Sequence, residues 1–192
     1  MLILTYLSWL LCSVYGTIPL FWLSIHPLTE HWRARGRSAY RILLPLWGLY
    51  VVIALALTWP WLNQRLYHHW GGILAGLALV AFGLYVYSQA FPSFSKVQVS
   101  GLAQLEPERH TQQLMTSGIR ARVRHPIYLG HLLEATGWTI ATGSLGLIAL
   151  LAFALITGAI MLHVEDSELE QRFGPAYSQY RRTVPAIIPR FF

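Results

Sequence analysis

Charged side chains are scarce in this sequence. Asp, Glu, Lys and Arg make up only 11% of its 192 residues, whereas hydrophobic residues make up 55% and the mean hydropathy is +0.45. A soluble domain carries about 25% charged residues, so this scarcity excludes an ordinary water-soluble fold. The alternation of apolar and polar residues that a transmembrane barrel needs is also missing. We therefore predict an all-α integral membrane protein, with residues 1–192 forming a single membrane domain.

Cysteine and the common cofactor motifs are nearly absent as well. Cys12 is the only cysteine and lies in the first apolar run, so an intramolecular disulfide is impossible, and we interpret Cys12 as a small core residue. The sequence has no internal repeat, no phosphate-binding Walker loop, no paired cysteine motif and no His-Glu-x-x-His zinc helix. No metal site is predicted.

Three stretches contain no Asp, Glu, Lys or Arg: residues 1–25, 42–64 and 71–95. Each is long enough for the roughly 20 residues that a helix needs to cross a bilayer, so we predict three transmembrane helices in residues 1–91. The first stretch has no basic residue before its apolar core. This favours a retained spanning helix over a signal peptide.

The fourth apolar stretch, residues 127–164, contains a single acidic residue, Glu134. One helix of this length would extend for about 57 Å, which is too long for a single span. The Thr142-Gly143-Ser144 sequence is a natural break. We therefore predict a hairpin of a fourth and a fifth transmembrane helix, so that residues 92–192 comprise a long loop, this hairpin and a C-terminal segment.

Basic residues occur in alternate loops. Of the 14 Lys and Arg, 13 lie in residues 26–41, in residues 96–124 or in the C-terminal tail, and only Arg65 lies elsewhere. The positive-inside rule then places the N-terminus outside and the C-terminus in the cytoplasm. The net charge of +6 and the pI near 9.8 favour anionic lipid head groups over nucleic acid as partners, because the cations are spread over short loops.

The segment 91–126 is far longer than a tight turn between two spans, and long ordered loops are usually functional. It ends with Arg120, Arg122 and Arg124 at alternate positions. This spacing leaves two interpretations open, a basic segment that binds anionic lipid and part of a binding site. Pro126 disfavours the helical conformation at His125, so the backbone N–H and C=O groups there are expected to be accessible to a polar ligand.

Carboxylates also occur at the predicted membrane boundary and within the fourth helix. An unpaired carboxylate at Glu165 would be costly, so we predict that it pairs with a cation, either from residues 120–124 or from a ligand. Glu134 lies three residues after His131 and on the same helix face. Two roles are open for it: a functional carboxylate, or a structural one that is hydrogen-bonded to His131 or to a neighbouring helix.

Together these elements resemble one family of membrane enzymes. The sequences Arg-His-Pro-Ile-Tyr-Leu-Gly at 124–130, Glu-Asp at 165–166, Phe-Gly-x-x-Tyr-x-x-Tyr at 173–180 and Val-Pro-x-x-Ile-Pro at 184–189 are similar to isoprenylcysteine carboxyl methyltransferases. Membrane phospholipid N-methyltransferases share the Arg-His-Pro element and the acidic pair. The resemblance covers residues 114–189, whereas the first three helices match in hydropathy alone.

The resemblance implies a methyl donor, S-adenosylmethionine, bound between the long loop, the helical hairpin and the C-terminal segment. The cofactor contacts that it implies are Gln112, Gln113, Leu114, Met115, Arg120, His125, Pro126, Ile127, Tyr128 and Glu165, with Gln98 as a further upstream candidate. Substrate-site candidates are Arg124, His131 and Glu134, and no catalytic residue is assigned. Methyl transfer from a sulfonium requires chiefly alignment and exclusion of water, without a metal or a covalent nucleophile.

The sequence departs from the family pattern near the acceptor. Asp166 replaces a second glutamate, and Met161 replaces an arginine of eukaryotic members. The resemblance implies that this arginine holds the substrate carboxylate. We predict a methyltransferase whose lipophilic acceptor, an isoprenylcysteine-like carboxylate, enters from the bilayer. N-methylation of a phospholipid amine is the alternative that Met161 and Glu134 favour. A non-catalytic membrane scaffold or transporter subunit is another, and it leaves the ordered motifs unexplained.

Overall fold

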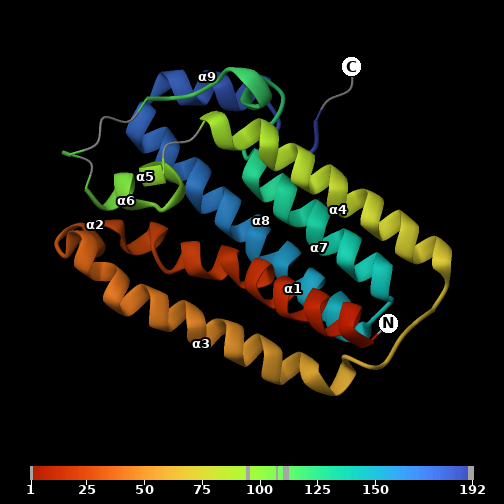
Figure 1. Ribbon diagram of the computed structural model, residues 1–192. Coiled ribbons are helices and arrows are strands. Elements are labelled where there is room, and N and C mark those ends of the chain that lie inside the picture. The colour runs from red at the N-terminus through yellow and green to blue at the C-terminus, as the bar shows by residue number, and fades with distance from the viewer. Residues whose placement is uncertain (1, 94–95, 107, 110–112, 190–192) are drawn as a thin grey trace.

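The computed structural model describes residues 2–93, 96–106, 108–109 and 113–189, and within these ranges every regular element is a helix (Figure 1). Five long helices form a bundle: α1 (Leu2–Leu23), α3 (Tyr40–Thr58), α4 (Trp70–Ala90), α7 (Pro126–Thr142) and α8 (Leu145–Phe173). Short helices connect or cap them: η1 (His26–Leu28), α2 (Thr29–Arg33), η2 (Gly36–Ala39), η3 (Trp59–Trp61), η4 (Phe91–Ser93), α5 (Lys96–Val99), α6 (Leu102–Leu105), η5 (Gly118–Ala121) and α9 (Pro175–Thr183). The predicted all-α fold is confirmed.

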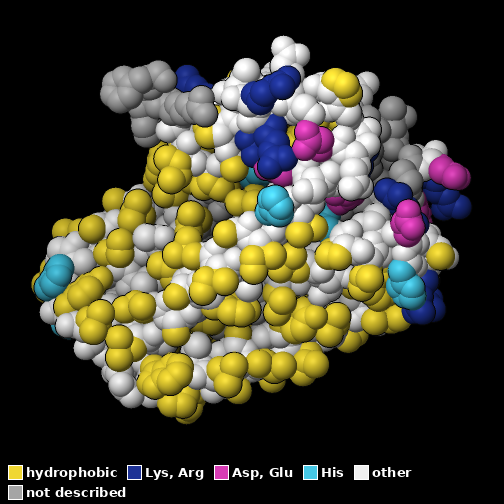
Figure 2. Space-filling view, turned by 180° about the vertical axis from the view of Figure 1, so that it is seen from behind, with side chains coloured by type: hydrophobic (Ala, Val, Ile, Leu, Met, Phe, Trp, Pro, Cys, Tyr) yellow, Lys and Arg dark blue, Asp and Glu magenta, His cyan; other side chains and the backbone are white. Residues whose placement is uncertain are grey.

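Four segments are long and apolar enough to cross a membrane: Leu2–Arg33, Gly36–Trp61, Trp70–Ala90 and Leu145–Phe173. Their outer faces expose large apolar side chains, such as Leu57 (65% exposed), Leu74 (69%) and Ile156 (65%). Figure 2 shows hydrophobic side chains over the flank of the bundle and most of the charged side chains near one end. A soluble protein rarely exposes so large an apolar surface. The chain is therefore a multi-pass membrane protein.

α7 is the shortest of the five long helices, at 17 residues, and it is not one of these four segments. It packs closely along α4 and turns directly into α8 through Gly143 and Ser144. Gly143 has a φ of 62°, a conformation that favours glycine, so the break predicted at residues 142–144 is confirmed. A fifth membrane crossing, by α7, stays a prediction.

α8 is longer than the predicted fifth span. The prediction ended at Val164, but the helix continues through the acidic run to Phe173. The acidic side chains there have partners: Arg124 binds Asp166, and both His26 and Arg172 bind Glu168. Paired carboxylates can remain in a helix at the membrane boundary at lower cost than isolated ones.

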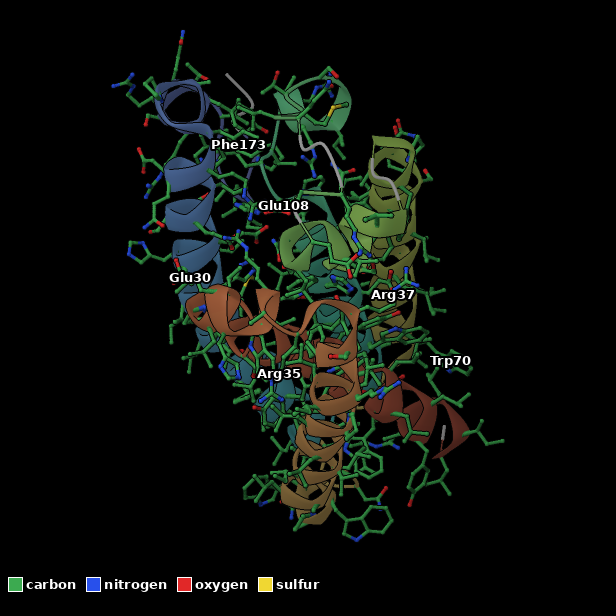
Figure 3. All side chains as sticks on the ribbon, turned by 90° about the vertical axis from the view of Figure 1, so that its left-hand side faces the viewer. Glu30, Arg35, Arg37, Trp70, Glu108 and Phe173 are labelled. Carbon is green, nitrogen blue, oxygen red and sulfur yellow. The ribbon has the colours of Figure 1, made fainter. Side chains whose placement is uncertain are left out.

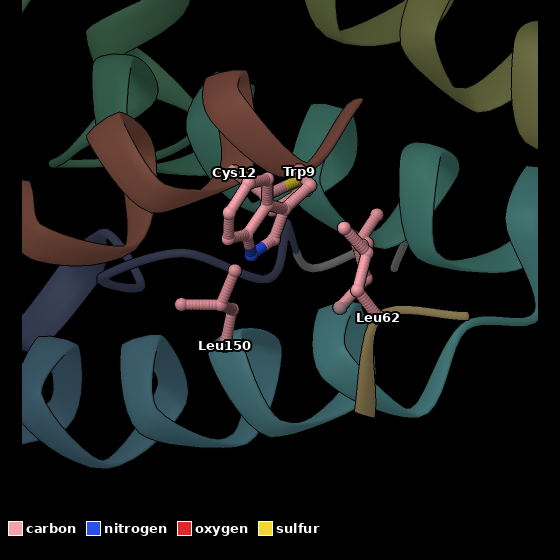
Figure 4. Close-up of a cluster of buried hydrophobic side chains, with 6 residues drawn as sticks. Trp9, Cys12, Leu62 and Leu150 are labelled. Carbon is pink, nitrogen blue, oxygen red and sulfur yellow. The ribbon is translucent and has the colours of Figure 1, made fainter. Parts of the chain in front are cut away.

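The main core cluster lies where α1, α8 and the segment after η3 meet (Figure 4). Trp9, Cys12, Leu62 and Leu150 are buried there, each less than 9% exposed. The indole N–H of Trp9 donates to Thr58 Oγ1 at 2.8 Å, which ties α1 to the end of α3. Cys12 is 2% exposed and free, in agreement with the small core residue predicted from the sequence.

The loops divide between two ends of the bundle. At one end the Arg65 guanidinium donates to Thr5 Oγ1, and the N–H of Leu66 donates to the carbonyl of Gly143, so the start of α1, the α3–α4 loop and the α7–α8 turn lie together. At the other end, here called the basic end, lie α2, α6, η5 and α9 (Figure 1). The described Lys and Arg other than Arg65 belong to segments at the basic end.

This division leads to a prediction of membrane orientation. Topology reporters fused after Arg41 and after Phe192 are both expected to report the cytoplasm, because the basic end follows the positive-inside rule. A reporter inserted after Asn63, in the α3–α4 loop, is expected on the opposite side and serves as the control. An external signal from either of the first two fusions would contradict the orientation.

Candidate functional site

The start of α7 is fixed by the C-terminal segment. The N–H groups of Arg124 and His125 donate to the carbonyls of Pro185 and Ala186, at 2.9 and 3.0 Å. Pro126 is the first residue of α7, a position where its missing N–H costs nothing. His125 lies outside the helical conformation, with φ −118° and ψ 65°, as predicted. Its N–H, however, is used by Ala186 rather than left accessible to a ligand.

Asp166, on α8, holds three structural elements together. Its Oδ2 accepts a hydrogen bond from Arg124 Nη2, its Oδ1 lies 3.0 Å from His125 Nε2, and the hydroxyl of Tyr177 donates to the same Oδ1. Nε of Arg181 lies 3.7 Å from Oδ2. Asp166 is only 5% exposed, so these contacts replace its lost hydration. This carboxylate therefore fixes the start of α7 and α9 relative to α8.

The protonation states of Arg124 and Tyr177 favour their hydrogen bonds to Asp166. Burial alone would lower the pKa of the Arg124 guanidinium, but the hydrogen bonds and charge of Asp166, with Tyr177, leave that pKa above its ordinary value. Burial raises the pKa of the Tyr177 hydroxyl, and its hydrogen bond to Asp166 raises it further. Arg124 therefore remains charged and Tyr177 remains a donor at neutral pH. The guanidinium of Arg124 also donates to the carbonyls of Arg181 and Val184.

α9 covers the loop that precedes α7. Tyr177, Tyr180 and Val184 form a buried cluster with Leu114, Leu169 and Phe173. The hydroxyl of Tyr180 donates to the carbonyl of Arg120 at 2.6 Å, and burial lowers the pKa of the Arg120 guanidinium. The loop, α8 and α9 thereby form one packed unit at the basic end.

A cavity of about 870 Å³ extends from this unit into the bundle. Nine of the ten predicted cofactor contacts line it: Gln113, Leu114, Met115, Arg120, His125, Pro126, Ile127, Tyr128 and Glu165. The tenth, Gln112, lies outside the described residues. Gln98, the upstream candidate, lines the cavity too. Figure 3 labels two further lining residues, Phe173 of α8 and Arg37 of η2.

Glu165 differs from its neighbour Asp166 in lacking a complete set of partners. Its Oε2 lies 3.5 Å from Nδ1 of His125, within ion-pair range, and the Tyr128 hydroxyl is a hydrogen-bonding neighbour of the carboxylate. The Oε2 atom is nevertheless buried without a hydrogen-bond partner in the described part of the chain. The cation predicted from residues 120–124 binds Asp166 instead. Glu165 therefore presents an unsatisfied acceptor at the cavity wall.

The remaining wall of the cavity is formed by the N-terminal half of the chain. Ring and aliphatic side chains from α1, α3 and α4 line it: Tyr15, Ile18, Phe21, Trp22, Leu44, Trp47 and Tyr87. His131 of α7 lies one turn beyond Tyr128 and lines the same part, called here the bilayer-side arm. Glu134, predicted for the substrate site, is buried directly behind Tyr15 and is not a lining residue.

Sequence reasoning did not find these N-terminal residues. Tyr15, Trp47 and Tyr87 lie far from the C-terminal motifs in the chain, and nothing in a single hydrophobic helix reveals which face lines a cavity. It named Asp166 as a member of the acidic pair, in place of a second glutamate, but assigned it no role. Tyr177 and Tyr180 were part of the recognised motif, and their spacing of three residues on α9 places both on one face, which was the available signal.

The sequence of this chain is similar to those of known methyltransferases. A sequence profile of the phospholipid methyltransferase family matches residues 72–176, more than half of the chain. Methanethiol S-methyltransferase 2 of Bradyrhizobium diazoefficiens is 34% identical over 128 residues, which cover 65% of this chain and 45% of that protein. Protein-S-isoprenylcysteine O-methyltransferase of Schizosaccharomyces pombe is 32% identical over 122 residues, covering 60% and 48% of the two chains.

A third relative matches over a longer stretch. Protein-S-isoprenylcysteine O-methyltransferase B of Arabidopsis thaliana is 28% identical over 142 residues, which cover 71% of this chain and 67% of the relative. The chain spans about half the length of the first two curated relatives. No solved structure gives a significant match.

Proposed function

Because the chain belongs to the phospholipid methyltransferase family, we propose that it transfers a methyl group from S-adenosylmethionine to a lipophilic acceptor inside the cavity. The observation that carries this proposal is the shape and composition of that single cavity. Its basic-end part is lined by the family motif residues and its bilayer-side arm by apolar rings from α1, α3 and α4. A polar cofactor and an apolar acceptor can therefore be held next to each other in one cavity.

The residues at the basic end suit an S-adenosyl compound. The volume of about 870 Å³ lies within the usual size range of ligand pockets, about 300–1,000 Å³. The unsatisfied carboxylate oxygen of Glu165 matches the amino group of such a ligand, and Tyr128 and Met115 offer flat or polarizable contacts. When bound, S-adenosylmethionine supplies a methyl group that is already activated by its positively charged sulfur.

The protein's own contribution is alignment and exclusion of water. Asp166 and Arg124 fix the start of α7, and thus the positions of His125 and Tyr128. The Tyr177 and Tyr180 cluster covers the basic end of the cavity. An acceptor in the bilayer-side arm would meet the donor in the same cavity, and positioning of two reactants can lower a reaction barrier by about 7 to 11 kcal/mol.

The first candidate acceptor is an isoprenylcysteine-like carboxylate. Its support is the C-terminal motif set and the two relatives that are named as methyltransferases of that substrate. The aromatic and aliphatic wall of the bilayer-side arm suits a prenyl chain. A phospholipid amine is the second candidate, because Met161, at the position of the family's arginine, is fully buried and apolar, and because a carboxylate, Glu134, lies behind the arm.

Binding of S-adenosylhomocysteine tests the cofactor site. Glu165→Ala and His125→Ala are each expected to weaken its binding roughly tenfold to a hundredfold, because a charge-assisted contact is commonly worth about 1.5 to 3 kcal/mol. Isothermal titration calorimetry of the detergent-solubilised protein measures this change. A scaffold or transporter subunit has no reason to bind the compound at all.

His163→Ala is the matched control for these variants. His163 lies on α8, two residues before Glu165, and is exposed. Its replacement is expected to leave the affinity unchanged, and thermal unfolding of each variant distinguishes lost contacts from lost structure. Wild-type affinity in both Glu165→Ala and His125→Ala would reject this cofactor site.

A further inference from the structure

Three buried polar atoms in or directly behind the wall of the bilayer-side arm lack a hydrogen-bond partner within the described ranges: Tyr87 Oη, His131 Nδ1 and Glu134 Oε1. They come from two helices, α4 and α7, and they are neighbours in space. Leaving a buried donor or acceptor unsatisfied typically costs about 1 to 3 kcal/mol. Tyr87 and His131 line the cavity, so their two atoms point to a ligand that supplies the missing partners.

The side chains of Tyr87, His131 and Glu134 are held in place by ring packing and burial. The His131 ring lies between the rings of Tyr15 and Tyr87, with centroid distances of 5.2 and 5.3 Å. Glu134 is 3% exposed and packs on α4 so closely that a Cβ at Gly83 would lie 2.8 Å from its Cγ. No hydrogen bond between His131 and Glu134 occurs in the described part of the chain. The predicted structural role had two forms, and the first, a bond to His131, is therefore absent. The second, a bond to a neighbouring helix, is represented by Tyr15 of α1 and leaves Glu134 Oε1 without a partner.

The electrostatics of this wall favour one kind of ligand. The Tyr15 hydroxyl is the hydrogen-bonding neighbour of the Glu134 carboxylate. A hydroxyl group that donates its hydrogen to a carboxylate has its oxygen lone pairs on the side away from that carboxylate, where they can accept another hydrogen bond. Glu134 takes part in no ion pair among the residues that the structure describes. Hydroxyl lone pairs and an uncompensated carboxylate together make this wall an acceptor of hydrogen bonds.

We propose that Tyr15, Tyr87, His131 and Glu134, here called the inner polar cluster, bind an N–H donor in the head group of the acceptor. The proposal rests on the proposed function and deepens it. Tyr15, Tyr87 and His131 line the cavity and contact the head group, while Glu134 acts through Tyr15 as a positioning residue. Both candidate acceptors carry this chemistry, as the amide N–H beside a prenylcysteine carboxylate or as the ammonium group of a phospholipid amine.

For specificity, this means that the inner polar cluster binds the nitrogen-containing group of the head group and not its carboxylate or phosphate. A carboxylate or phosphate placed against the cluster would be repelled by Glu134 in a site of low dielectric. An acceptor without an N–H group would leave Tyr87 Oη and His131 Nδ1 unsatisfied, and binding sites discriminate strongly in that situation.

Matched pairs of amphiphiles test the proposal by binding. The first pair is N-acetyl-S-farnesylcysteine and S-farnesylthiopropionic acid, which lacks the nitrogen. The second is dodecylphosphoethanolamine and the methyl ester of dodecyl phosphate. For one pair, the wild-type protein in detergent is expected to bind the N–H compound about tenfold more tightly, the value of one good hydrogen bond to a charged site. The pair that shows the preference identifies the source of the N–H group.

Variants of the inner polar cluster complete the test. Glu134→Gln and Tyr87→Phe are each expected to reduce the preference to about threefold or less, corresponding to loss of part of that hydrogen bond. Tyr85→Phe is the control, because Tyr85 lies on the same helix but is 58% exposed on the outer face. A ratio of affinities, unlike an absolute affinity, does not change when a variant merely loosens the fold.

The outcomes separate this proposal from the proposed function. Equal binding within both pairs by the wild-type protein, or a preference that survives Glu134→Gln unchanged, would overturn the inner polar cluster as an N–H site. Failure to bind S-adenosylhomocysteine would reject the methyltransferase assignment. That result would leave the affinity ratios of the amphiphile pairs valid, because measuring them requires neither a cofactor nor catalytic turnover.

Discussion

Replacing Asp166 with alanine is expected to detach the C-terminal segment from the bundle and to abolish measurable binding of S-adenosylhomocysteine. The variant leaves the Arg124 guanidinium buried without its carboxylate, since both side chains of the pair are only 7% exposed. Removing one partner of a buried pair commonly costs about 3 to 5 kcal/mol. The Tyr177 hydroxyl and the His125 ring lose a partner at the same time. The expected result is a lower midpoint of thermal unfolding.

Limited proteolysis distinguishes local detachment from global unfolding. Trypsin is expected to cleave Asp166→Ala after Arg181 and Arg182 much faster than the wild-type protein, because α9 loses its anchor, while the membrane-spanning helices remain protected. Glu170→Ala is the matched control. Glu170 pairs with Arg181 in an exposed position, and such pairs contribute about 0 to 1 kcal/mol. Equal effects of the two substitutions would contradict the central role of Asp166.

The sequence allowed the long helices to be predicted because their physical signal is local. A run without charge must be placed in lipid wherever the rest of the chain lies, so the predicted ends of α1, α3 and α4 lie within six residues of the observed ones. The Gly143 turn was equally local. The continuation of α8 to Phe173 was not predictable in this way, since it depends on partners that approach Asp166 and Glu168 from distant segments.

In the candidate site, too, the residues with a local sequence signal were predicted and those positioned by long-range packing were not. Residues of the C-terminal motifs, such as His125, Tyr128 and Glu165, were named from the sequence and are brought together at one cavity wall. The opposite wall, with Tyr15 and Trp47, depends on how α1 and α3 pack against the C-terminal half, which no motif records. The residues on the acceptor side of the cavity could therefore be identified only from the packing of the helices in the structure.

The packing of α4 on α7 explains how this wall is held in position. Gly76 and Gly137 face each other where the two helices are closest: a Cβ at Gly76 would lie 2.3 Å from the carbonyl oxygen of Gly137 and 2.6 Å from the backbone N of Ala141. Both contacts are with backbone atoms, so no side-chain rotation can relieve them. Small residues at such a crossing allow the van der Waals contact that holds membrane helices together.

Gly76→Val is accordingly expected to force α4 and α7 apart and to destabilise the protein by about 3 kcal/mol or more, at or beyond the upper end of typical overpacking costs. Unfolding by SDS in mixed micelles measures the loss, and binding of S-adenosylhomocysteine is expected to fall with it, because Tyr128 lies on α7 and His125 directly precedes this helix. Gly48→Val is the matched control on α3, where a Cβ would meet nothing within 4 Å. If Gly76→Val and Gly48→Val unfold at the same SDS fraction, close contact of the two backbones is not what holds the α7 wall of the cavity in place.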